Sequence, residues 1–439
     1  MLISHIRSRL AGRETLQKIV ANSGWLVADN ILRMGLGLIV AALTARYLGP
    51  EQFGIFNYAV AFVAIFSSIA TLGLESIVVR DIVLDPACTA VTLGSAFVMK
   101  MLGGAAAFVM TMTAIWLLRP SDTLAIWLVG LTSAGIFFQA FDTISFWFRS
   151  QYQSKFIVFA KNTAFLLGSG GKILLIFLKA PLIAFAWAGL AEIIIGAACL
   201  VVVYNRQGHF LMQWHVNPER AKELIKNSWP LIFTGVAIYI QARIDQVMLG
   251  DMIGDQEVGQ YSAAMRLIEA FGFIPMVVMN SVAPAITSAK ASSEKLYYDR
   301  LLKVYRLMFI LFLITALPIY LFADQIVILF YGDEYRSAGV LLSLFAVRLF
   351  FANFGVAKNL FIANENLFRY SLVTAITGSI INIVLNYILI PKYASIGAIW
   401  AMIISFFVMV FFMDIFYSEV RKNLFIMIKA ILTPWKFRF

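Results

Sequence analysis

The sequence is poor in charged residues and in cysteine, and each shortage argues against a class of protein. Only 13% of its 439 residues are charged, against about 25% in soluble domains. Such a chain has too few polar side chains to cover a water-soluble particle of its size. The 2 cysteines, Cys88 and Cys199, and the 3 histidines argue against a disulfide framework and a metal cluster. No Walker loop or nucleophile elbow is present, so we expect no cofactor and no enzyme activity.

The chain is rich in long apolar runs, with 61% hydrophobic residues and a mean hydropathy of +0.84. A membrane-spanning helix needs about 20 mainly apolar residues. Such runs lie at 23–46, 53–74, 92–117, 124–148, 156–177, 182–204, 229–250, 257–286, 304–323, 337–363, 370–390 and 393–417. They do not alternate as the strands of a membrane barrel would. The sequence therefore predicts an all-α polytopic membrane protein with about 12 transmembrane helices.

The distribution of Lys and Arg sets the expected orientation. They are frequent at both termini and in the loops that follow every second span. The opposite loops hold only five, Arg46, Arg119, Lys179, Arg336 and Lys392. Because short cytoplasmic loops are enriched in basic residues, both termini are predicted to be cytoplasmic. The net charge of +11 is then explained by topology and by contact with anionic membrane lipid, and no nucleic-acid partner is expected.

A short internal repeat divides the chain. Gly49 and Gly54, between the first two spans, recur as Gly254 and Gly259, between the seventh and eighth. We interpret both copies as outer hairpins whose glycines supply positive φ. The repeat predicts two six-helix lobes with the same orientation in the membrane. Their predicted limits are 1–204 and 228–439, the second with a basic cytoplasmic tail, joined by a cytoplasmic linker at 205–227.

Ionisable residues interrupt the apolar runs. Each costs about 2.5–3.5 kcal/mol near the centre of a membrane helix, so it must be paired, reach the surface or line water. The basic residues concerned include Arg33, Lys100, Lys172, Arg243, Arg266, Arg348 and Lys358, and the acids are Asp29, Asp142, Glu192, Asp245, Glu269 and Asp414. Two interpretations remain open. The charges neutralise one another inside packed helices, or they line a wet passage for a polar cargo.

Sequence spacing predicts some of the partners. Asp29 and Arg33 are spaced i, i+4 and therefore share a helix face, and the same reasoning pairs Arg266 with Glu269 at i, i+3. Arg243 and Asp245 are two residues apart and do not share a face, so one of them needs a partner elsewhere.

Positions near helix ends suggest a different solution for two further residues. Lys358 and Asp414 lie near predicted cytoplasmic ends, from which their side chains can reach the surface.

Two functional sets follow from these charges. The candidate substrate pathway comprises Arg33, Lys172, Arg243, Arg266 and Arg348, basic residues that could line a wet passage for a polar or anionic cargo. The candidate ion-coupling residues are Asp29, Asp142, Glu192, Asp245 and Glu269, since a carboxylate in a low-dielectric environment can take up a proton near neutral pH.

Several segments resemble a known family of membrane proteins. Residues 45–58, and Leu72 to Glu75 with Arg80, resemble the first outer hairpin and second-span end of bacterial polysaccharide flippases. Residues 243–250, 258–267, 329–338 and 396–398 extend the likeness into the second half. The resemblance covers about residues 22–417 and is to the O-antigen type of polysaccharide flippase within the multidrug/oligosaccharidyl-lipid/polysaccharide exporter superfamily.

That resemblance implies two six-helix lobes arranged as a V in the bacterial plasma (inner) membrane. It implies an undecaprenyl-pyrophosphate-linked oligosaccharide as cargo, moved from the cytoplasmic to the outer leaflet by alternating access with an ion gradient as energy source. It also implies a place in lipopolysaccharide assembly, with other polysaccharide assembly proteins as candidate partners.

Two other functions stay open. The first is export of a drug or of another lipid-linked precursor. The second is a membrane polymerase or ligase, a class that generally places its chemistry in a large outer loop. The longest outer loop here is Asp324–Arg336, which argues against that class.

Overall fold

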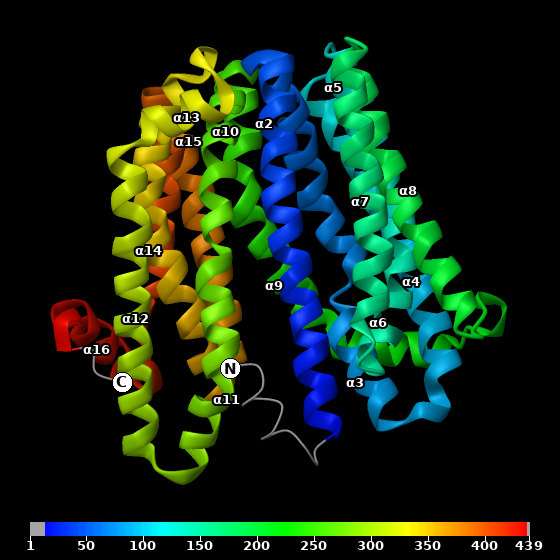
Figure 1. Ribbon diagram of the computed structural model, residues 1–439, viewed down its shortest axis with the longest axis vertical. Helices are drawn as coiled ribbons and strands as arrows, with labels where there is room; N and C mark the ends of the chain where they lie inside the picture. Colours follow the sequence, from blue (N-terminus) through cyan, green and yellow to red (C-terminus); the bar gives the residue numbers. More distant parts are fainter. Residues whose placement is uncertain (1–13, 437–439) are drawn as a thin grey trace, which may run out of the picture. The chain divides into compact units, whose positions relative to one another are not determined.

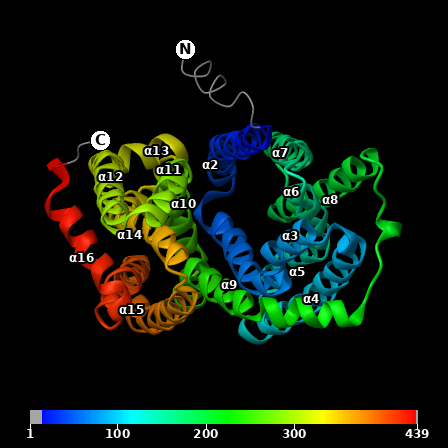
Figure 2. The same ribbon diagram turned by 90° about the horizontal axis from the view of Figure 1, so that it is seen from below.

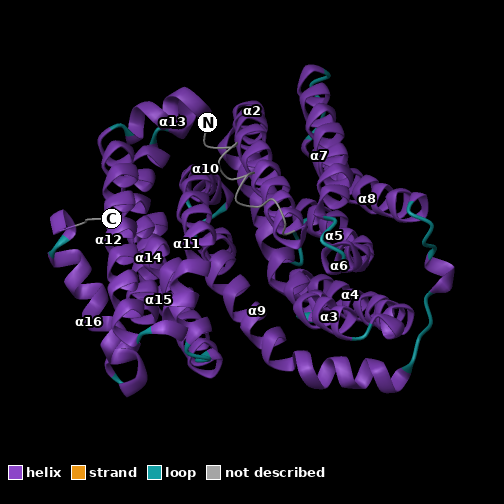
Figure 3. Ribbon diagram, turned by 60° about the horizontal axis from the view of Figure 1, so that its bottom comes forward, coloured by secondary structure: helices purple, strands orange, loops and turns teal. Residues whose placement is uncertain are grey.

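The computed structural model describes residues 14–436, except for the side chains of residues 14–23 and 26–28. Every regular element in this part of the chain is helical, and it contains no strand (Figure 3). The chain forms two compact units. The first comprises residues up to Val40 together with Phe66–Gly235, and the second comprises Ala41–Ile65 together with Val236–Phe439. Helices α2 (Glu14–Thr71) and α9 (Pro218–Met252) each contribute to both units (Figure 1).

The remaining elements of the first unit run consecutively from the end of α2. They are α3 (Leu74–Leu84), η1 (Pro86–Cys88), α4 (Thr89–Leu118), α5 (Thr123–Phe138), η2 (Gln139–Asp142), α6 (Thr143–Ser150), α7 (Ser154–Phe177), α8 (Leu182–Arg206) and η3 (Leu211–Gln213). Trp147, Phe148 and Tyr204 lie in the buried hydrophobic core of this unit, and Leu224 of α9 joins them there. The first turns of α9 are therefore part of the first unit.

The second unit continues from α9 in the same way. Its elements are α10 (Asp255–Phe271), α11 (Phe273–Ser292), α12 (Glu294–Leu321), α13 (Ala323–Tyr331), η4 (Asp333–Tyr335), α14 (Ser337–Asn364), α15 (Phe368–Val410), η5 (Phe412–Ile415), α16 (Ser418–Leu432) and η6 (Pro434–Lys436). Aromatic side chains of α14 and of the end of α15 pack together in this unit, where the rings of Phe350 and Phe411 stack with centroids 5.6 Å apart.

The helices confirm the predicted fold class. In the part of the chain described, 8 helical segments are long and apolar enough to cross a membrane. Two of them, Asp29–Leu84 with 56 residues and Phe368–Ile415 with 48, are more than twice as long as a ~30 Å hydrocarbon core is thick, at 1.5 Å per residue. Each is interrupted, the first at Gly49 with φ 70° and the second at Ala394 with φ 46°. All the predicted spans overlap helices, which satisfy their own backbone hydrogen bonds within lipid.

The linker expected at residues 205–227 is partly helical and is attached to the first unit. The Asn217 side chain caps α9 by accepting bonds from the backbone N–H groups of Glu219 (2.8 Å) and Arg220 (3.2 Å). The backbone N–H of Asn217 donates to Ser95 Oγ of α4 at 3.1 Å. Gly94 permits this approach, because a Cβ there would lie 2.4 Å from the His215 carbonyl oxygen. The division into lobes at 1–204 and 228–439 stays a prediction.

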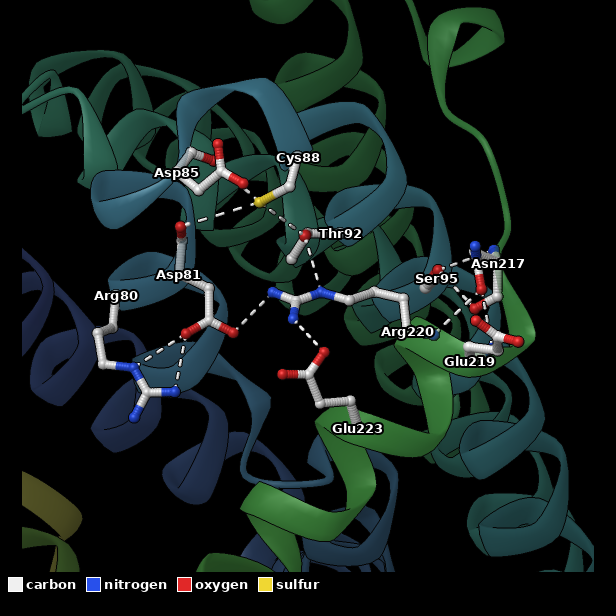
Figure 4. Close-up of polar contacts among 10 residues, drawn as sticks. All are labelled: Arg80, Asp81, Asp85, Cys88, Thr92, Ser95, Asn217, Glu219, Arg220 and Glu223. Atoms are coloured by element: carbon white, nitrogen blue, oxygen red, sulfur yellow. Dashed lines mark hydrogen bonds and ion pairs between the residues drawn. The ribbon is translucent and has the colours of Figure 1, made fainter.

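Arg220 reinforces this attachment (Figure 4). Its guanidinium donates to Asp81 Oδ2 of α3 at 2.7 Å, to Glu223 Oε2 at 2.6 Å and to Thr92 Oγ1 of α4 at 3.2 Å. Partial burial disfavours its charge, but the bond and charge of Glu223 together with Asp81 outweigh that cost and raise the pKa of Arg220. One side chain thus ties three helices of the first unit together.

The repeated hairpins pack directly against each other inside the second unit. A Cβ on Gly54 would lie 1.7 Å from the backbone oxygen of Asp255, and one on Gly259 would lie 1.9 Å from that of Pro50. Each hairpin therefore places a glycine against the backbone that begins the other's second helix. The expected positive φ is present at Gly49 (70°) and Gly254 (133°). At Gly54 and Gly259 the expectation was wrong, because both are helical and serve close approach instead.

Candidate functional site

A charged cavity of about 240 Å³ lies within the first unit. Its charged walls come from four elements, with Arg33 on α2, Asp142 on η2, Lys161 on α7 and Glu192 on α8. The remaining lining residues are Phe138, Gln139, Ala164, Ile193, Gly196, Ala197 and Leu200. Polar groups this concentrated among membrane-spanning helices are expensive unless they pair or meet water or a ligand.

Three ion pairs surround this cavity. Arg33 Nε lies 2.7 Å from Asp29 Oδ1, which confirms the pair predicted from the i, i+4 spacing. Lys161 Nζ lies 2.9 Å from Asp142 Oδ1. Lys172 Nζ lies 2.8 Å from Glu192 Oε2. All these side chains keep between 16% and 37% of their surface exposed, so they stay within reach of an entering group.

The six charges balance one another, which limits how the cavity can bind an ion. An anion must replace a carboxylate beside one of the cations or find a donor that is still free. The Arg33 side chain supplies such a donor, because its buried Nη2 has no hydrogen-bond partner among the described residues. The same guanidinium lies 5.3 Å from the centre of the Phe165 ring, a cation–π contact that orients it.

Local sequence explains how the acids reach the cavity. A Cβ on Gly168 of α7 would lie 2.6 Å from Glu192 Oε2, so only glycine leaves room for that carboxylate. Between α5 and α6 the chain changes to the short 3₁₀ segment η2. The carbonyl of Gln139 in this segment accepts a bond from Lys100 Nζ at 2.8 Å. The interruption therefore supplies a backbone acceptor at membrane depth as well as the Asp142 carboxylate.

A second polar cluster is buried in the second unit around Asp245, which is 1% exposed. Tyr261 Oη donates to its Oδ2 at 2.8 Å, and Asn386 Nδ2 donates to its Oδ1 at 2.6 Å. The Oδ1 atoms of Asn382 and Asn386 have no partner among the described residues. A buried carboxylate beside amide oxygens matches the ligands that hard cations prefer.

One ion pair predicted in this unit, between Arg266 and Glu269, needs correction. Glu269 Oε1 lies 3.4 Å from Arg243 Nη2, so Glu269 pairs with Arg243 and not with Arg266 as its spacing indicated. Arg266 is exposed on α10. The prediction that Arg243 and Asp245 point to different partners is confirmed. Arg348 lies over the Phe406 ring at 5.8 Å, with a buried Nε that has no partner among the described residues.

The expectation that Lys358 and Asp414 reach the membrane surface was wrong. Both are buried, and they form an ion pair that also includes the Tyr370 hydroxyl. Lys358 Nζ further donates to the carbonyls of Met409 (3.0 Å) and Val410 (2.9 Å) at the end of α15. The physical reason is tertiary packing, which supplies each charge with a buried partner far along the chain.

Several residues of these clusters escaped the sequence reasoning. Lys161 lies inside a predicted apolar span, so a complete list of the ionisable residues in the spans would have included it. Asn382 and Asn386 offered a weaker signal, two amides at i, i+4 on the apolar helix α15. Tyr261 lies within the segment 258–267 that resembles the flippase family, but nothing local in the sequence indicates its bond to Asp245.

Comparison with known protein families gives two matches. Residues 19–290, more than half of the chain, match the family described as polysaccharide biosynthesis protein. Residues 230–388 match the MatE family. A curated relative, the capsular polysaccharide biosynthesis protein CapF of Staphylococcus aureus, is 20% identical over 219 residues, which cover 49% of this chain. The matched region spans about half (54%) of that relative's length.

Solved structures share the fold at low sequence identity. The lipid II flippase MurJ in an inward closed conformation aligns with a TM-score of 0.72 and 15% identity, covering 95% of this chain and 92% of that one. An inward-facing multidrug resistance MATE family transporter of the MOP superfamily aligns with a TM-score of 0.69 and 18% identity, covering 90% and 96%. The chain is a multi-pass membrane protein with the fold of these transporters, and it belongs to the polysaccharide biosynthesis protein family.

Proposed function

We propose that the protein is a flippase for undecaprenyl-pyrophosphate-linked oligosaccharide repeat units, which it moves from the cytoplasmic to the outer leaflet of the bacterial inner membrane. Membership of the polysaccharide biosynthesis family supports the saccharide cargo, and the likeness to a lipid II flippase supports the fold. The observation that carries the proposal is the charged cavity among spanning helices of the first unit. A charged recess within a membrane helix bundle suits the polar head of a lipid-linked sugar, because ionisable groups among spanning helices are costly unless they pair or meet water or a ligand.

The cargo's diphosphate is the group that this cavity fits. Arg33 offers a free buried Nη2, and Lys161 and Lys172 offer ammonium groups now held by carboxylates. Arg binds phosphate oxygens through a planar fork of donors, whereas Lys acts as a point charge. The other proposed pathway residues, Arg243, Arg266 and Arg348, lie in the second unit and would meet the cargo's sugars or phosphates at another stage of transport.

The Asp245 cluster is the proposed ion-coupling centre. Its carboxylate is the most deeply buried of the candidates, and the unpartnered oxygens of Asn382 and Asn386 give it the composition of a monovalent-cation or proton site. Asp29, Asp142, Glu192 and Glu269 each have a basic partner. An ion that binds one conformation more tightly than the other can drive alternating access.

The test is a deletion strain in which lipid-linked oligosaccharides are quantified leaflet by leaflet. We expect one saccharide-linked species to accumulate on the cytoplasmic side and surface O-antigen to fall. A plasmid copy with Arg33→Ala should restore export to about one tenth of the wild-type level, because one charge-assisted contact of ~1.5 kcal/mol is lost. Arg33→Lys restoring full export would show that charge is sufficient.

The same strain separates the alternatives. Unchanged lipid-linked oligosaccharide together with drug sensitivity would support a drug exporter, and accumulation of a different lipid-linked precursor would support export of that precursor. Accumulation of single repeat units on the outer leaflet would instead indicate a polymerase or ligase. Normal distribution of every lipid-linked species would refute the flippase.

A further inference from the structure

The C-terminal helix α16 has three distinct edges. The helix packs against α12 (Figure 2). Its first edge is buried and consists of Val420, Asn423, Leu424, Met427 and Ala430. The second is apolar and exposed, with Phe425 at 68% and Leu432 at 64%. The third carries the exposed Lys422 and Lys429. A helix with an apolar edge beside a basic one lies in the plane of a membrane interface, between acyl chains and headgroups.

Contacts from α12 fix the position of this helix. The buried Arg306 donates to the carbonyl of Lys436 at 2.9 Å and to Thr433 Oγ1 at 2.8 Å, just beyond the C-terminal end of α16. Tyr305 Oη donates to Asn423 Oδ1 at 3.0 Å in the middle of the helix. Tyr305 and Arg306, two successive residues of α12, therefore fix the middle and the C-terminal end of α16. Because the helix is rigid, these contacts also fix the position of its N-terminal end.

A cavity of about 450 Å³ opens at that N-terminal end. Its lining consists of Asn366, Leu367, Phe368, Arg369 and Tyr370 from the start of α15, with Tyr417 and Glu419 from the start of α16. Tyr370 and Tyr417 meet edge to face with ring centroids 4.7 Å apart. Arg369 and Glu419 are the charged lining residues, and neither forms an ion pair with another described residue.

The surroundings of the cavity indicate an amphipathic occupant. Phe368, which lines the cavity, and Phe416, which precedes the lining residue Tyr417, are each 63% exposed. Large exposed aromatics beside a polar recess match the boundary between lipid chains and headgroups. A guanidinium and a carboxylate on the walls of one recess match a ligand with one negative and one positive group. The carboxylate further favours a primary ammonium, which can donate hydrogen bonds to it, over a quaternary one, which cannot.

We propose that this cavity binds the headgroup of a phospholipid of the phosphatidylethanolamine class. The lipid phosphate contacts Arg369, the ammonium contacts Glu419, and the acyl chains leave along Phe368 and Phe416. The cavity shares no residue with the charged cavity of the first unit or with the Asp245 cluster, so this lipid site does not depend on the proposed cargo.

Lipid competition on the purified full-length protein tests the assignment. Delipidated protein in detergent is titrated with phosphatidylethanolamine, phosphatidylcholine or phosphatidylglycerol of matched chains, and bound lipid is counted by native mass spectrometry. We expect phosphatidylethanolamine to bind about tenfold more tightly than either competitor, the value of one charge-assisted hydrogen bond. Equal binding of all three lipids would overturn the proposal.

Two substitutions at exposed positions should change lipid binding in different ways. Glu419→Gln removes the ammonium contact, so phosphatidylethanolamine should lose its advantage and phosphatidylglycerol should gain. Arg369→Gln removes the phosphate contact and should weaken all three lipids. The matched control is Lys295→Gln, an exposed lysine on α12 outside the cavity, which should retain the wild-type order.

A soluble headgroup identifies the source of the ligand. Glycerophosphoethanolamine carries the same phosphate and ammonium without acyl chains and should displace the bound lipid only at concentrations at least a hundredfold higher. Displacement at equal concentration would overturn the assignment to a lipid. Wild-type affinities in Arg369→Gln together with the wild-type order in Glu419→Gln would overturn the assignment to this cavity.

Discussion

Charged side chains within the spans pair both with near neighbours on the same helix and with residues on other elements. The Asp29–Arg33 pair followed from helical spacing alone. The Lys161–Asp142 and Lys172–Glu192 pairs bring together residues about 20 positions apart on different elements. The predicted partner of Glu269 was wrong because helical spacing compares residues of one helix only, whereas its partner Arg243 lies on another helix, α9.

The Lys161–Asp142 pair allows a test of cargo contact separately from stability. Lys161→Met leaves the Asp142 carboxylate without its partner, so it should lower both the unfolding temperature and export. The double variant Lys161→Met with Asp142→Asn removes both charges and should recover the unfolding temperature, because no unpaired charge remains. Its export should stay about tenfold low if Lys161 binds the cargo.

The measurements are thermal unfolding of the purified protein and surface polysaccharide in the complemented deletion strain. Lys155→Met, at the exposed start of α7, is the control and should match the wild type in both. Wild-type export from the double variant would show that the pair is structural.

At the scale of elements, the hydropathy of the chain predicted the helices well and their interruptions poorly. The predicted spans coincide with helices because lipid leaves the backbone no other partner than itself. The repeated hairpins were recognised from their glycines, but Gly54 and Gly259 turned out to be contact points between hairpins. Which glycine supplies a positive φ and which supplies space depends on what packs against it, and one sequence alone does not contain that information.

The hairpin contact predicts a large effect from a small substitution. Gly54→Ala places a Cβ against the backbone oxygen of Asp255, so the two hairpins must separate. Overpacking of this kind costs about 1–3 kcal/mol, and more where backbone atoms are the obstacle. We expect a lower unfolding temperature and less folded protein in membranes.

Gly35→Ala in the same helix α2 is the matched control, because a Cβ there meets nothing within 4 Å. It should be neutral or stabilise by about 0.5–1 kcal/mol through helix propensity. If both variants unfold at the wild-type temperature, the hairpins are not held by this contact.

At the scale of the whole molecule, coupling to an ion gradient is the property that the Asp245 cluster predicts. Asp245→Asn keeps the shape of the side chain and its contact with Tyr261 but removes the ionisable group. In proteoliposomes, an imposed proton or sodium gradient should accelerate transport by the wild type about tenfold or more. A tenfold acceleration corresponds to a shift of ~1.4 kcal/mol in the balance between the two conformations. The variant should respond to neither gradient.

Asp299→Asn, an exposed carboxylate on α12 outside the cluster, is the control and should respond as the wild type does. Acceleration of Asp245→Asn by a gradient would assign coupling to another carboxylate. A wild type indifferent to both gradients would contradict ion-driven transport altogether.

The sharing of α2 and α9 between the two compact units determines how the protein can be recombined with its relatives. In a hybrid gene with a single junction within residues 205–227, residues 41–65 would come from one parent and the rest of their compact unit from the other. Gly54 of the first parent would then pack against the hairpin of the second. Functional hybrids need three exchange points, near residues 40, 65 and 235, so that each compact unit comes from a single parent. Natural recombination at a single crossover between distant homologues should therefore seldom yield a folded protein.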